Sequence, residues 1–191
     1  RFCIWIYKIY YEARGTQGNN ASLDISAGLT DQILDGSTHL GNVYPSQFSD
    51  CLETQELCQK MTEILRQEGV RGMVGVDLLI RRIDGKIIPY VLEVNARQTG
   101  AIYAGFLAYE LRGQLKPWIG HNNITVPAGT DLYMYQAYLE SKNVAYHHGD
   151  REGIMIICNG NIENNKMMIL ILAESRERTW ELLKIAQGMK R

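Results

Sequence analysis

The sequence has no excess of charge of either sign and lacks long apolar runs. Its 191 residues include 20 lysines and arginines and 21 aspartates and glutamates, so the formal net charge is −1. This balance gives no reason to expect nucleic acid or an anionic membrane as a partner. The apolar segment 2–11 is too short to span a bilayer and is interrupted by Lys8. No signal peptide is recognisable either.

Cysteine is scarce, and its spacing excludes the common metal sites. The four cysteines form no C-x-x-C pair and match no zinc-binding pattern. Cys51 and Cys58 both fall on an expected helix, which favours buried free thiols and a reducing, cytoplasmic location. The sequence also lacks a convincing Ser-His-Asp or Cys-His set, so chemistry through a side-chain nucleophile is not expected.

The apolar residues that are present support a mixed helix and strand fold. Hydrophobic residues make up 46% of the chain, enough for a substantial core. Asp50 with Glu53 is expected to cap the first helix as a capping box, and Ser175 to cap the last. Loops are expected at 15–20, at 36–46 and, as a linker or an ordered loop, at 114–131. Periodicity predicts strands at 2–11, 21–27, 29–35, 72–82, 87–95, 153–158 and 166–173, and helices at 50–68, 99–112, 132–142 and 175–188.

These elements predict an α+β fold in which an antiparallel sheet carries helices, followed by a small α-β-β-α tail domain. We expect residues 1–124 to form the main domain and residues 125–191 the tail. The chain begins with Arg1 inside an apolar run, so we also expect it to be a fragment of a longer protein.

The hairpin at 72–95 carries the residues with the clearest chemistry. Side chains on a strand alternate between faces, so Glu93 and Asn95 share one face of the second strand. A two-residue loop at Asp84 and Gly85 would place Asp77 on the opposite face, whereas a three-residue loop or a bulge would place it beside Glu93. Mg²⁺ requires about six oxygen ligands that converge on one point, so the second register is the one that a metal site needs.

The apolar pattern favours the same register. It places Val76, Leu78 and Ile80 together with Tyr90, Leu92 and Val94 on one continuous apolar face. The other register would mix acidic and aliphatic residues on both faces, which is costly where one face is core. The acidic face with Asp77 and Glu93 could instead be a solvated face of an open sheet; the shared register and the residues that follow favour the metal site.

The residues after Asn95 suit an anion. Arg97 continues the alternation, and a guanidinium binds phosphate or carboxylate oxygens with two parallel hydrogen bonds. Thr99 and Gly100 then open a helix, whose free N–H groups favour negative charge. Arg81 lies on the Asp77 face, where it contacts phosphate or is a solvated strand residue. Thr38, His39 and Asn42 lie in a polar segment that could contact substrate but that we interpret as an ordinary surface turn.

The segment 72–101, GMVGVDLLIRRIDGKIIPYVLEVNARQTGA, resembles the C-terminal half of the ATP-grasp fold, whose signature is G-x-x-G-x-D, a hairpin and E-x-N-x-R. The segment 29–46, LTDQILDGSTHLGNVYPS, the hairpin and the tail are similar to those of peptide ligases related to the pheganomycin-biosynthesis enzyme. The first resemblance implies an ATP-dependent carboxylate–amine ligase that works through an acyl phosphate. Its partners would be a small-molecule or amino-acid carboxylate and an amine or peptide.

The resemblance also implies roles for individual residues and cofactors. Glu93 would bridge two Mg²⁺ ions, with Mn²⁺ as a substitute, and Asp77 and Asn95 would each bind one ion. Arg97 would hold the γ-phosphate of ATP or the acyl phosphate and so act as the catalytic residue. Residue 96 is alanine where many relatives have proline, and only residues 1–20 precede the resembling region, so the ATP-binding half is expected to be incomplete. The alternatives are a non-catalytic nucleotide-binding or scaffold protein, a truncated inactive fragment, or a kinase using the same metals.

Overall fold

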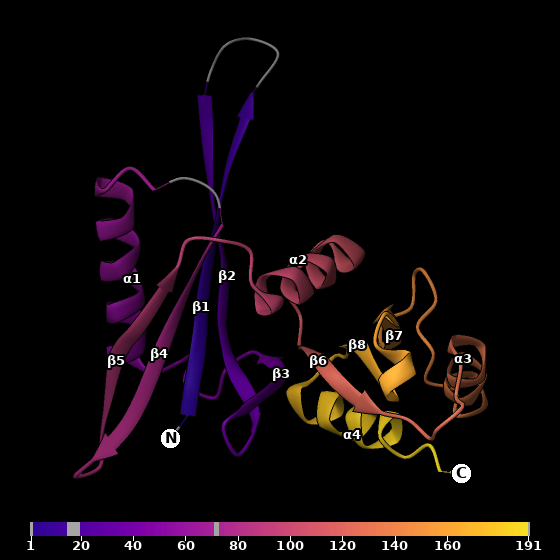
Figure 1. Ribbon diagram of the computed structural model, residues 1–191. Coiled ribbons are helices and arrows are strands. Elements are labelled where there is room, and N and C mark those ends of the chain that lie inside the picture. The colour runs from indigo at the N-terminus through magenta and orange to yellow at the C-terminus, as the bar shows by residue number, and fades with distance from the viewer. Residues whose placement is uncertain (1, 15–19, 71–72, 191) are drawn as a thin grey trace. The chain divides into compact units, whose positions relative to one another are not determined.

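The computed structural model describes residues 2–14, 20–70 and 73–190, with side chains from residue 28 onward (Figure 1). Within these residues the fold is α+β with antiparallel sheet. It consists of two compact units, one formed by residues 1–31 and 46–103 and the other by residues 32–45 and 104–191. The elements are β1 (Phe2–Arg14), β2 (Asn20–Asp35), β3 (Thr38–Tyr44), α1 (Leu52–Gln67), β4 (Met73–Ile83), β5 (Lys86–Asn95), α2 (Gly100–Arg112), β6 (Trp118–Thr125), α3 (Leu132–Ser141), β7 (Gly153–Cys158), the 3₁₀ turn η1 (Ile162–Asn164), β8 (Lys166–Leu172) and α4 (Arg176–Ala186).

The first unit is a sheet in the order β5-β4-β1-β2 with α1 packed on one face. Alternate residues of β4 supply the buried face, because side chains of a strand point to opposite sides in turn. Val74, Val76, Leu78 and Ile80 are each at most 4% exposed, and the α1 stripe of Leu57, Cys58, Met61 and Leu65 packs against them. The apolar spacing of this helix predicts that Ile64 belongs to the same stripe, but Ile64 is 41% exposed.

The start of α1 differs from the expected capping box. Cys51, not Asp50, is the N-cap residue, and no side chain caps the helix. The Cys51 thiol instead donates to the carboxylate of Glu53 at 3.0 Å, so Glu53 does not reach back to the backbone as a capping box requires. At the end of the helix, Gly69 adopts a φ of 73° and donates its N–H to the Arg66 carbonyl at 3.0 Å, as is typical of a helix C-terminus.

The second unit contains the end of β2 and a sheet in the order β3-β6-β8-β7. β3 and β6 pair antiparallel, with Gly41 opposite His121 and Asn42 opposite Gly120. Both strands lie where loops were expected, so the sequence interpretation was wrong at 36–46 and at 114–131. Polar residues and glycines are common in turns, which is why these strands were interpreted as loops. In the structure the glycines let β3 and β6 approach each other closely: a Cβ on Gly41 would lie 2.1 Å from the Gly120 carbonyl oxygen.

The helices of the tail are fixed by caps and by two tyrosines. Ser175 caps α4 as expected, its hydroxyl accepting from the Arg178 N–H at 3.1 Å, and Asp131 caps α3. The Tyr135 hydroxyl donates to the Ala186 carbonyl at 2.8 Å, and the Tyr138 hydroxyl donates to the Ile185 carbonyl at 2.6 Å. These bonds reach carbonyls in the last turn of α4, and the Ile185 carbonyl also accepts from the Gly188 N–H at 2.9 Å.

The division of the chain into a main domain and a tail domain between residues 124 and 125 remains a proposal.

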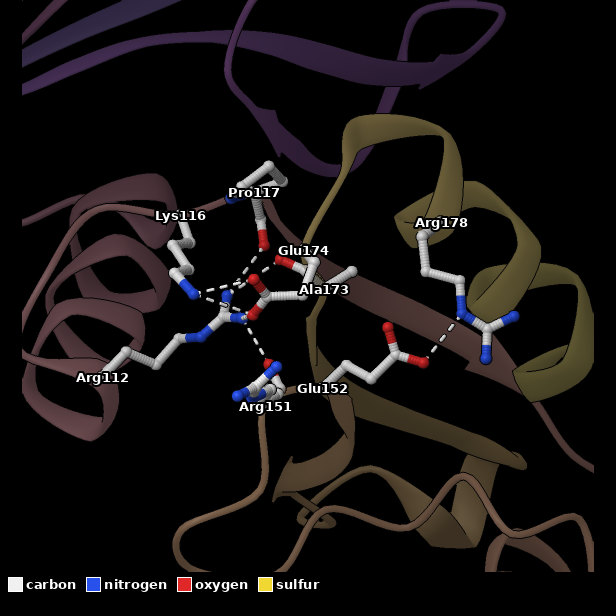
Figure 2. Close-up of polar contacts among 8 residues, drawn as sticks. All are labelled: Arg112, Lys116, Pro117, Arg151, Glu152, Ala173, Glu174 and Arg178. Atoms are coloured by element: carbon white, nitrogen blue, oxygen red, sulfur yellow. Dashed lines mark hydrogen bonds and ion pairs between the residues drawn. The ribbon is translucent and has the colours of Figure 1, made fainter.

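A buried arginine connects several segments of the second unit (Figure 2). The Arg112 side chain is only 5% exposed and forms an ion pair with Glu174 at 3.0 Å. Its guanidinium also donates to the main-chain carbonyls of Pro117 at 3.3 Å, Ala173 at 3.0 Å, and Arg151. Lys116 binds the same Glu174 carboxylate at 2.8 Å. The end of α2 is thus joined by hydrogen bonds to three separate segments of the unit.

Among the described helices, we find none that is both long and apolar enough to cross a bilayer.

Candidate functional site

The β4–β5 hairpin places Asp77 directly opposite Glu93 and Gly75 opposite Asn95. Directly paired residues of an antiparallel ladder share a face, and two positions along a strand return to that face. Asp77, Glu93 and Asn95 therefore share one face, as predicted. The loop itself has only two residues, since Ile83 pairs with Lys86. The register shifts by one through a bulge next to Asp77, at which Leu92 is the extra residue.

The predicted apolar face of this hairpin is half correct. Val76, Leu78 and Ile80 are buried, but Tyr90, Leu92 and Val94 are 41%, 55% and 41% exposed. The bulge is one cause, because it pairs Tyr90 with Leu79 and so moves Tyr90 to the face of Asp77. The second cause of this exposure is the position of β5, which is the outermost strand of the described sheet and has a neighbouring strand on one side only.

The three predicted metal ligands differ in their exposure to solvent. Asp77 is 9% exposed and Asn95 is 5% exposed, whereas Glu93 and Arg97 are exposed. Burial, and then the nearby Glu93 carboxylate, raise the pKa of Asp77 to about 7, although the Arg97 guanidinium acts in the opposite direction. Two carboxylates that share one face repel each other, and a cation between them would remove that cost.

Two buried polar atoms at this site have no hydrogen-bond partner among the described residues. They are Oδ1 of Asp77 and Nδ2 of Asn95. A buried polar atom without a partner costs about 1–3 kcal/mol, so such atoms in a native structure call for a ligand, an ion or water. The oxygen and nitrogen of an Asn amide exchange on a half-turn, so Asn95 can present its oxygen to a cation.

The donor set fits a hard divalent cation. In the described part of the chain, no group of three His, Cys, Asp or Glu side chains could hold a metal ion. Two carboxylates and one carboxamide on a single face are instead the oxygen donors that Mg²⁺ prefers, and Mg²⁺ commonly completes its shell with phosphate oxygens and water. The side chains present therefore suit a metal–phosphate site better than a metal site made only of protein ligands.

The segment after β5 leads directly into α2. Within the described part of the chain, the Arg97 guanidinium makes only a long 3.4 Å hydrogen bond to the Gln98 carbonyl, and the side chain is exposed. Thr99 is 7% exposed, and its hydroxyl accepts from the Ile102 N–H at 3.4 Å, which makes Thr99 the N-cap of α2. The start of the G-x-x-G-x-D motif, Gly72, lies outside the described residues.

Sequence reasoning missed the second neighbour of Asp77. β1 pairs with β4 on the side away from β5, and Trp5 lies opposite Asp77. Trp5 is in turn paired with Thr30 of β2, a fully buried residue. The strand at 2–11 was expected, but antiparallel strands far apart in sequence carry no pairing signal of their own. The row of paired positions that includes the site therefore runs across four strands.

A buried histidine in the second unit was also missed. His121 of β6 is 1% exposed, and burial lowers its pKa to about 4. His39 of β3 contributes to this shift and contacts Asn42, with 3.0 Å between Nε2 and Oδ1. Asn42 is 2% exposed, so the interpretation of 36–46 as a surface turn was wrong. These residues are buried because β3 pairs with β6. The sequence did not predict this pairing.

Comparison with known families identifies part of the chain. Residues 15–101 match the family model described as an ATP-grasp domain. The match includes α1, β4, β5 and the residues Asp77, Glu93, Asn95 and Arg97. A search of curated proteins found no match to the sequence.

Solved structures of ATP-grasp enzymes resemble the whole chain. The ATPase subunit of phosphoribosylaminoimidazole carboxylase from Aquifex aeolicus is 13% identical with a TM-score of 0.57, over 98% of this chain and 56% of that one. Biotin carboxylase from Campylobacter jejuni, 12% identical, gives 0.63 over 97% and 44%. Glycinamide-RNase-transformylase T from Mycobacterium tuberculosis, 15% identical, gives 0.61 over 100% and 56%.

The chain spans about half the length of these solved structures. At these identities the likeness concerns the fold. The fold similarity covers nearly the whole chain and so includes the hairpin that the family model matches. Residues 15–101 are therefore similar to an ATP-grasp domain, and the chain has a fold similar to that of about half of each of these enzymes.

Proposed function

We propose that this chain is the metal- and phosphate-binding part of an ATP- and Mg²⁺-dependent ligase that joins a carboxylate to an amine through an acyl phosphate. The observation that carries the proposal is the cross-strand pair of Asp77 and Glu93, with Asn95 on the same face. The buried Asp77 oxygen without a partner gives this face a reason to bind a cation. The ATP-grasp match over the same residues supports the nucleotide as the source of phosphate.

The residues have distinct roles in the proposal. Glu93, Asp77 and Asn95 would hold Mg²⁺, or Mn²⁺ in its place, and the exposed carboxylate of Glu93 suits a ligand shared between two ions. A bound cation would neutralise phosphate charge, and this supplies most of the help that phosphoryl transfer needs. Arg97 would bind a phosphate oxygen with its planar guanidinium and stabilise negative charge as it develops.

The substrates in the proposal are small molecules. The carboxylate is a small organic acid or an amino acid, and the amine is free or the amino end of a peptide, as in a peptide ligase. Nucleic acid and membrane have no part in it, and a cytoplasmic location belongs to the same proposal. The chain spans about half of the similar solved structures, so we propose this activity for the complete enzyme, with adenine and substrate sites contributed by further residues.

Binding of Mg²⁺ with a non-hydrolysable ATP analogue tests the proposal. Glu93→Gln keeps the size of the side chain and removes its charge. Glu56→Gln, at an exposed position of α1, is the matched control. We expect calorimetric binding that requires Mg²⁺, is weakened at least about tenfold by Glu93→Gln and is unchanged in the control. Equal binding by wild type and Glu93→Gln would contradict the assignment of the site.

Turnover by the complete enzyme distinguishes the ligase from its alternatives. A ligase releases ADP and phosphate together with an amide product. ADP release without an amide would indicate a kinase, and nucleotide binding without ADP release would indicate a non-catalytic protein. Either outcome would overturn the proposed reaction while leaving the metal site in place.

A further inference from the structure

The connection between β7 and β8 is rich in asparagine. Residues 158–165 have the sequence CNGNIENN and contain four asparagines, at positions 159, 161, 164 and 165. We call this segment the asparagine loop. Asparagine is a chemically labile residue, because the main-chain nitrogen of the next residue can attack its side-chain carbonyl carbon. The structure shows which of the four asparagines is free to react in this way.

Hydrogen bonds within the asparagine loop restrain three of the four. A main-chain N–H that donates to a carbonyl is held by its acceptor and keeps its proton, so its nitrogen is not available for attack. The N–H groups that follow positions 161, 164 and 165 are all held in this way. They belong to Ile162, Asn165 and Lys166, and they donate to the carbonyls of Asn159, Ile162 and Asn161 at 3.0, 2.8 and 3.2 Å.

The fourth asparagine is different. Gly160 follows Asn159, and its N–H makes no hydrogen bond to any residue that the structure describes. The Asn159 side-chain amide also has no partner among the described residues, and both residues are exposed. The Asn164 amide, by contrast, donates to Oδ1 of Asn161 at 2.6 Å. Both reacting groups are therefore free only at Asn159 within the described loop.

Gly160 also offers little steric hindrance to the attack. Glycine has no Cβ beside its nitrogen, and its backbone reaches conformations that other residues avoid. Asn159 and Gly160 form the single Asn-Gly dipeptide of the sequence. A Cβ built on Gly160 would meet only the Cys158 sulfur, at 3.6 Å, so the surroundings of this position are open to water.

We propose that Asn159 is a site of spontaneous deamidation, with water as the co-reactant. Hydroxide takes the proton of the Gly160 nitrogen, which bonds to Cγ of Asn159. The side-chain nitrogen leaves as ammonia with a proton from water, and this restores the hydroxide. Water then opens the five-membered succinimide. Cleavage between the nitrogen and Cγ gives aspartate, and cleavage between the nitrogen and the main-chain carbonyl carbon gives isoaspartate.

The net reaction consumes one water and releases one ammonia, and the chain gains one negative charge. No oxidant, metal or nucleotide takes part, so the site goes beyond the proposed ligase reaction. Both products alter the exposed turn that Asn159 closes through its carbonyl bond to the Ile162 N–H. Isoaspartate, which adds a methylene group to the main chain, changes this turn more than aspartate does.

Peptide mass spectrometry of the folded chain, kept in mildly alkaline buffer, measures the conversion of each asparagine. We expect Asn159 to become a mixture of aspartate and isoaspartate while Asn161 and Asn164 stay intact, at a rate that rises with hydroxide concentration. A protein isoaspartate methyltransferase with a labelled methyl donor detects the isoaspartate independently. Conversion of Asn159 in urea but not in the folded chain, or equal conversion of the three asparagines, would overturn the proposal.

Gly160→Ala tests the role of the glycine nitrogen. The added Cβ makes only an ordinary contact with Cys158, so the fold should be kept, and thermal unfolding checks this. We expect conversion of Asn159 to be at least about tenfold slower in this variant. Asn164→Gln, at an exposed position of the same loop, is the matched control and should convert Asn159 at the wild-type rate. Equal rates in wild type and folded Gly160→Ala would contradict the proposed attack.

Discussion

Asp77 and Glu93 are directly paired across β4 and β5, and the pairing depends on a bulge at Leu92 that sits beside them. Without the bulge, the two-residue turn at Asp84 and Gly85 would place the carboxylates on opposite faces. The bulge leaves Leu92 without a partner on β4 and brings together the carboxylates of Asp77 and Glu93, which repel each other. Bulges are frequent next to functional sites because they redirect a side chain in this way.

Replacing Asp77 with Asn separates the role of this residue in binding from any role in folding. The change removes a buried charge whose Oδ1 has no partner, so the metal-free chain should be as stable as wild type or more so. Binding of Mn²⁺, followed by electron paramagnetic resonance, should fall at least about tenfold. Asp50→Asn, at an exposed position, should change neither property. A large loss of stability in Asp77→Asn would show instead that the carboxylate is structural.

Replacing Arg112 with Lys should destabilise the second unit. The buried guanidinium serves three main-chain carbonyls and Glu174 at once, and an ammonium cannot reproduce this planar set of donors. Leaving buried carbonyls without donors should lower the free energy of unfolding by about 2–4 kcal/mol. Urea unfolding measures the change, and Arg66→Lys, at an exposed position, should stay within about 0.5 kcal/mol of wild type.

The sequence predicted which hairpin residues share a face better than it predicted the sheet around them. The alternation of Glu93 and Asn95 depends only on local strand geometry, and the need for a shared register with Asp77 followed from it. The position of the bulge could not be predicted, because Leu92 is an ordinary strand residue and a register shift depends on the pairing of two whole strands.

The strand β6 illustrates the opposite case. Its residues His121, Asn122 and Asn123 are typical of a turn. His121 pairs with both β3 and β8, and Asn122 and Asn123 lie in the irregularity before pairing with β8 resumes at Ile124. Trp118 and Ile119, at its start, are fully buried and have the strand signal that the neighbouring asparagines obscured. Tertiary pairing therefore overrode local propensity here, whereas the tail helices, with caps at Asp131 and Ser175, carried local signals of their own.

Acid should remove the stabilisation that His121 contributes, whereas protonation of Asp77, whose folded pKa is raised to about 7, acts in the opposite direction. The folded pKa of His121, about 4, lies below the unfolded value of about 6.5, so the unfolded state takes up a proton first as the pH falls. The stabilisation is fully present above pH 6.5 and is lost between about pH 6.5 and pH 4, by about 2 kcal/mol from pH 7.5 to pH 5. Burial also lowers the pKa of His39, which adds to the loss in the same direction.

Urea unfolding at pH 7.5 and pH 5 measures this dependence. His121→Gln removes the titrating group, so the change in the free energy of unfolding from pH 7.5 to pH 5 should be less destabilising than in wild type by about the His121 contribution, even where the substitution lowers stability at both values. His148→Asn, at an exposed position, should keep the wild-type dependence. An equal loss between the two pH values in wild type and His121→Gln would show that His121 is not the group responsible.

Replacing Gly41 with Ala should disrupt the pairing of β3 with β6. The added Cβ would lie 2.1 Å from the Gly120 carbonyl oxygen and 2.9 Å from Cα of His121, and neither backbone atom can move without shifting the strand. Overpacking of this kind costs about 1–3 kcal/mol, and a clash with backbone belongs at the upper end. Thermal unfolding should show a clearly lower midpoint for Gly41→Ala. Gly160→Ala, where the new Cβ meets only the Cys158 sulfur at 3.6 Å, should melt close to wild type, so equal midpoints for the two variants would mean that the strands do not approach as closely as described.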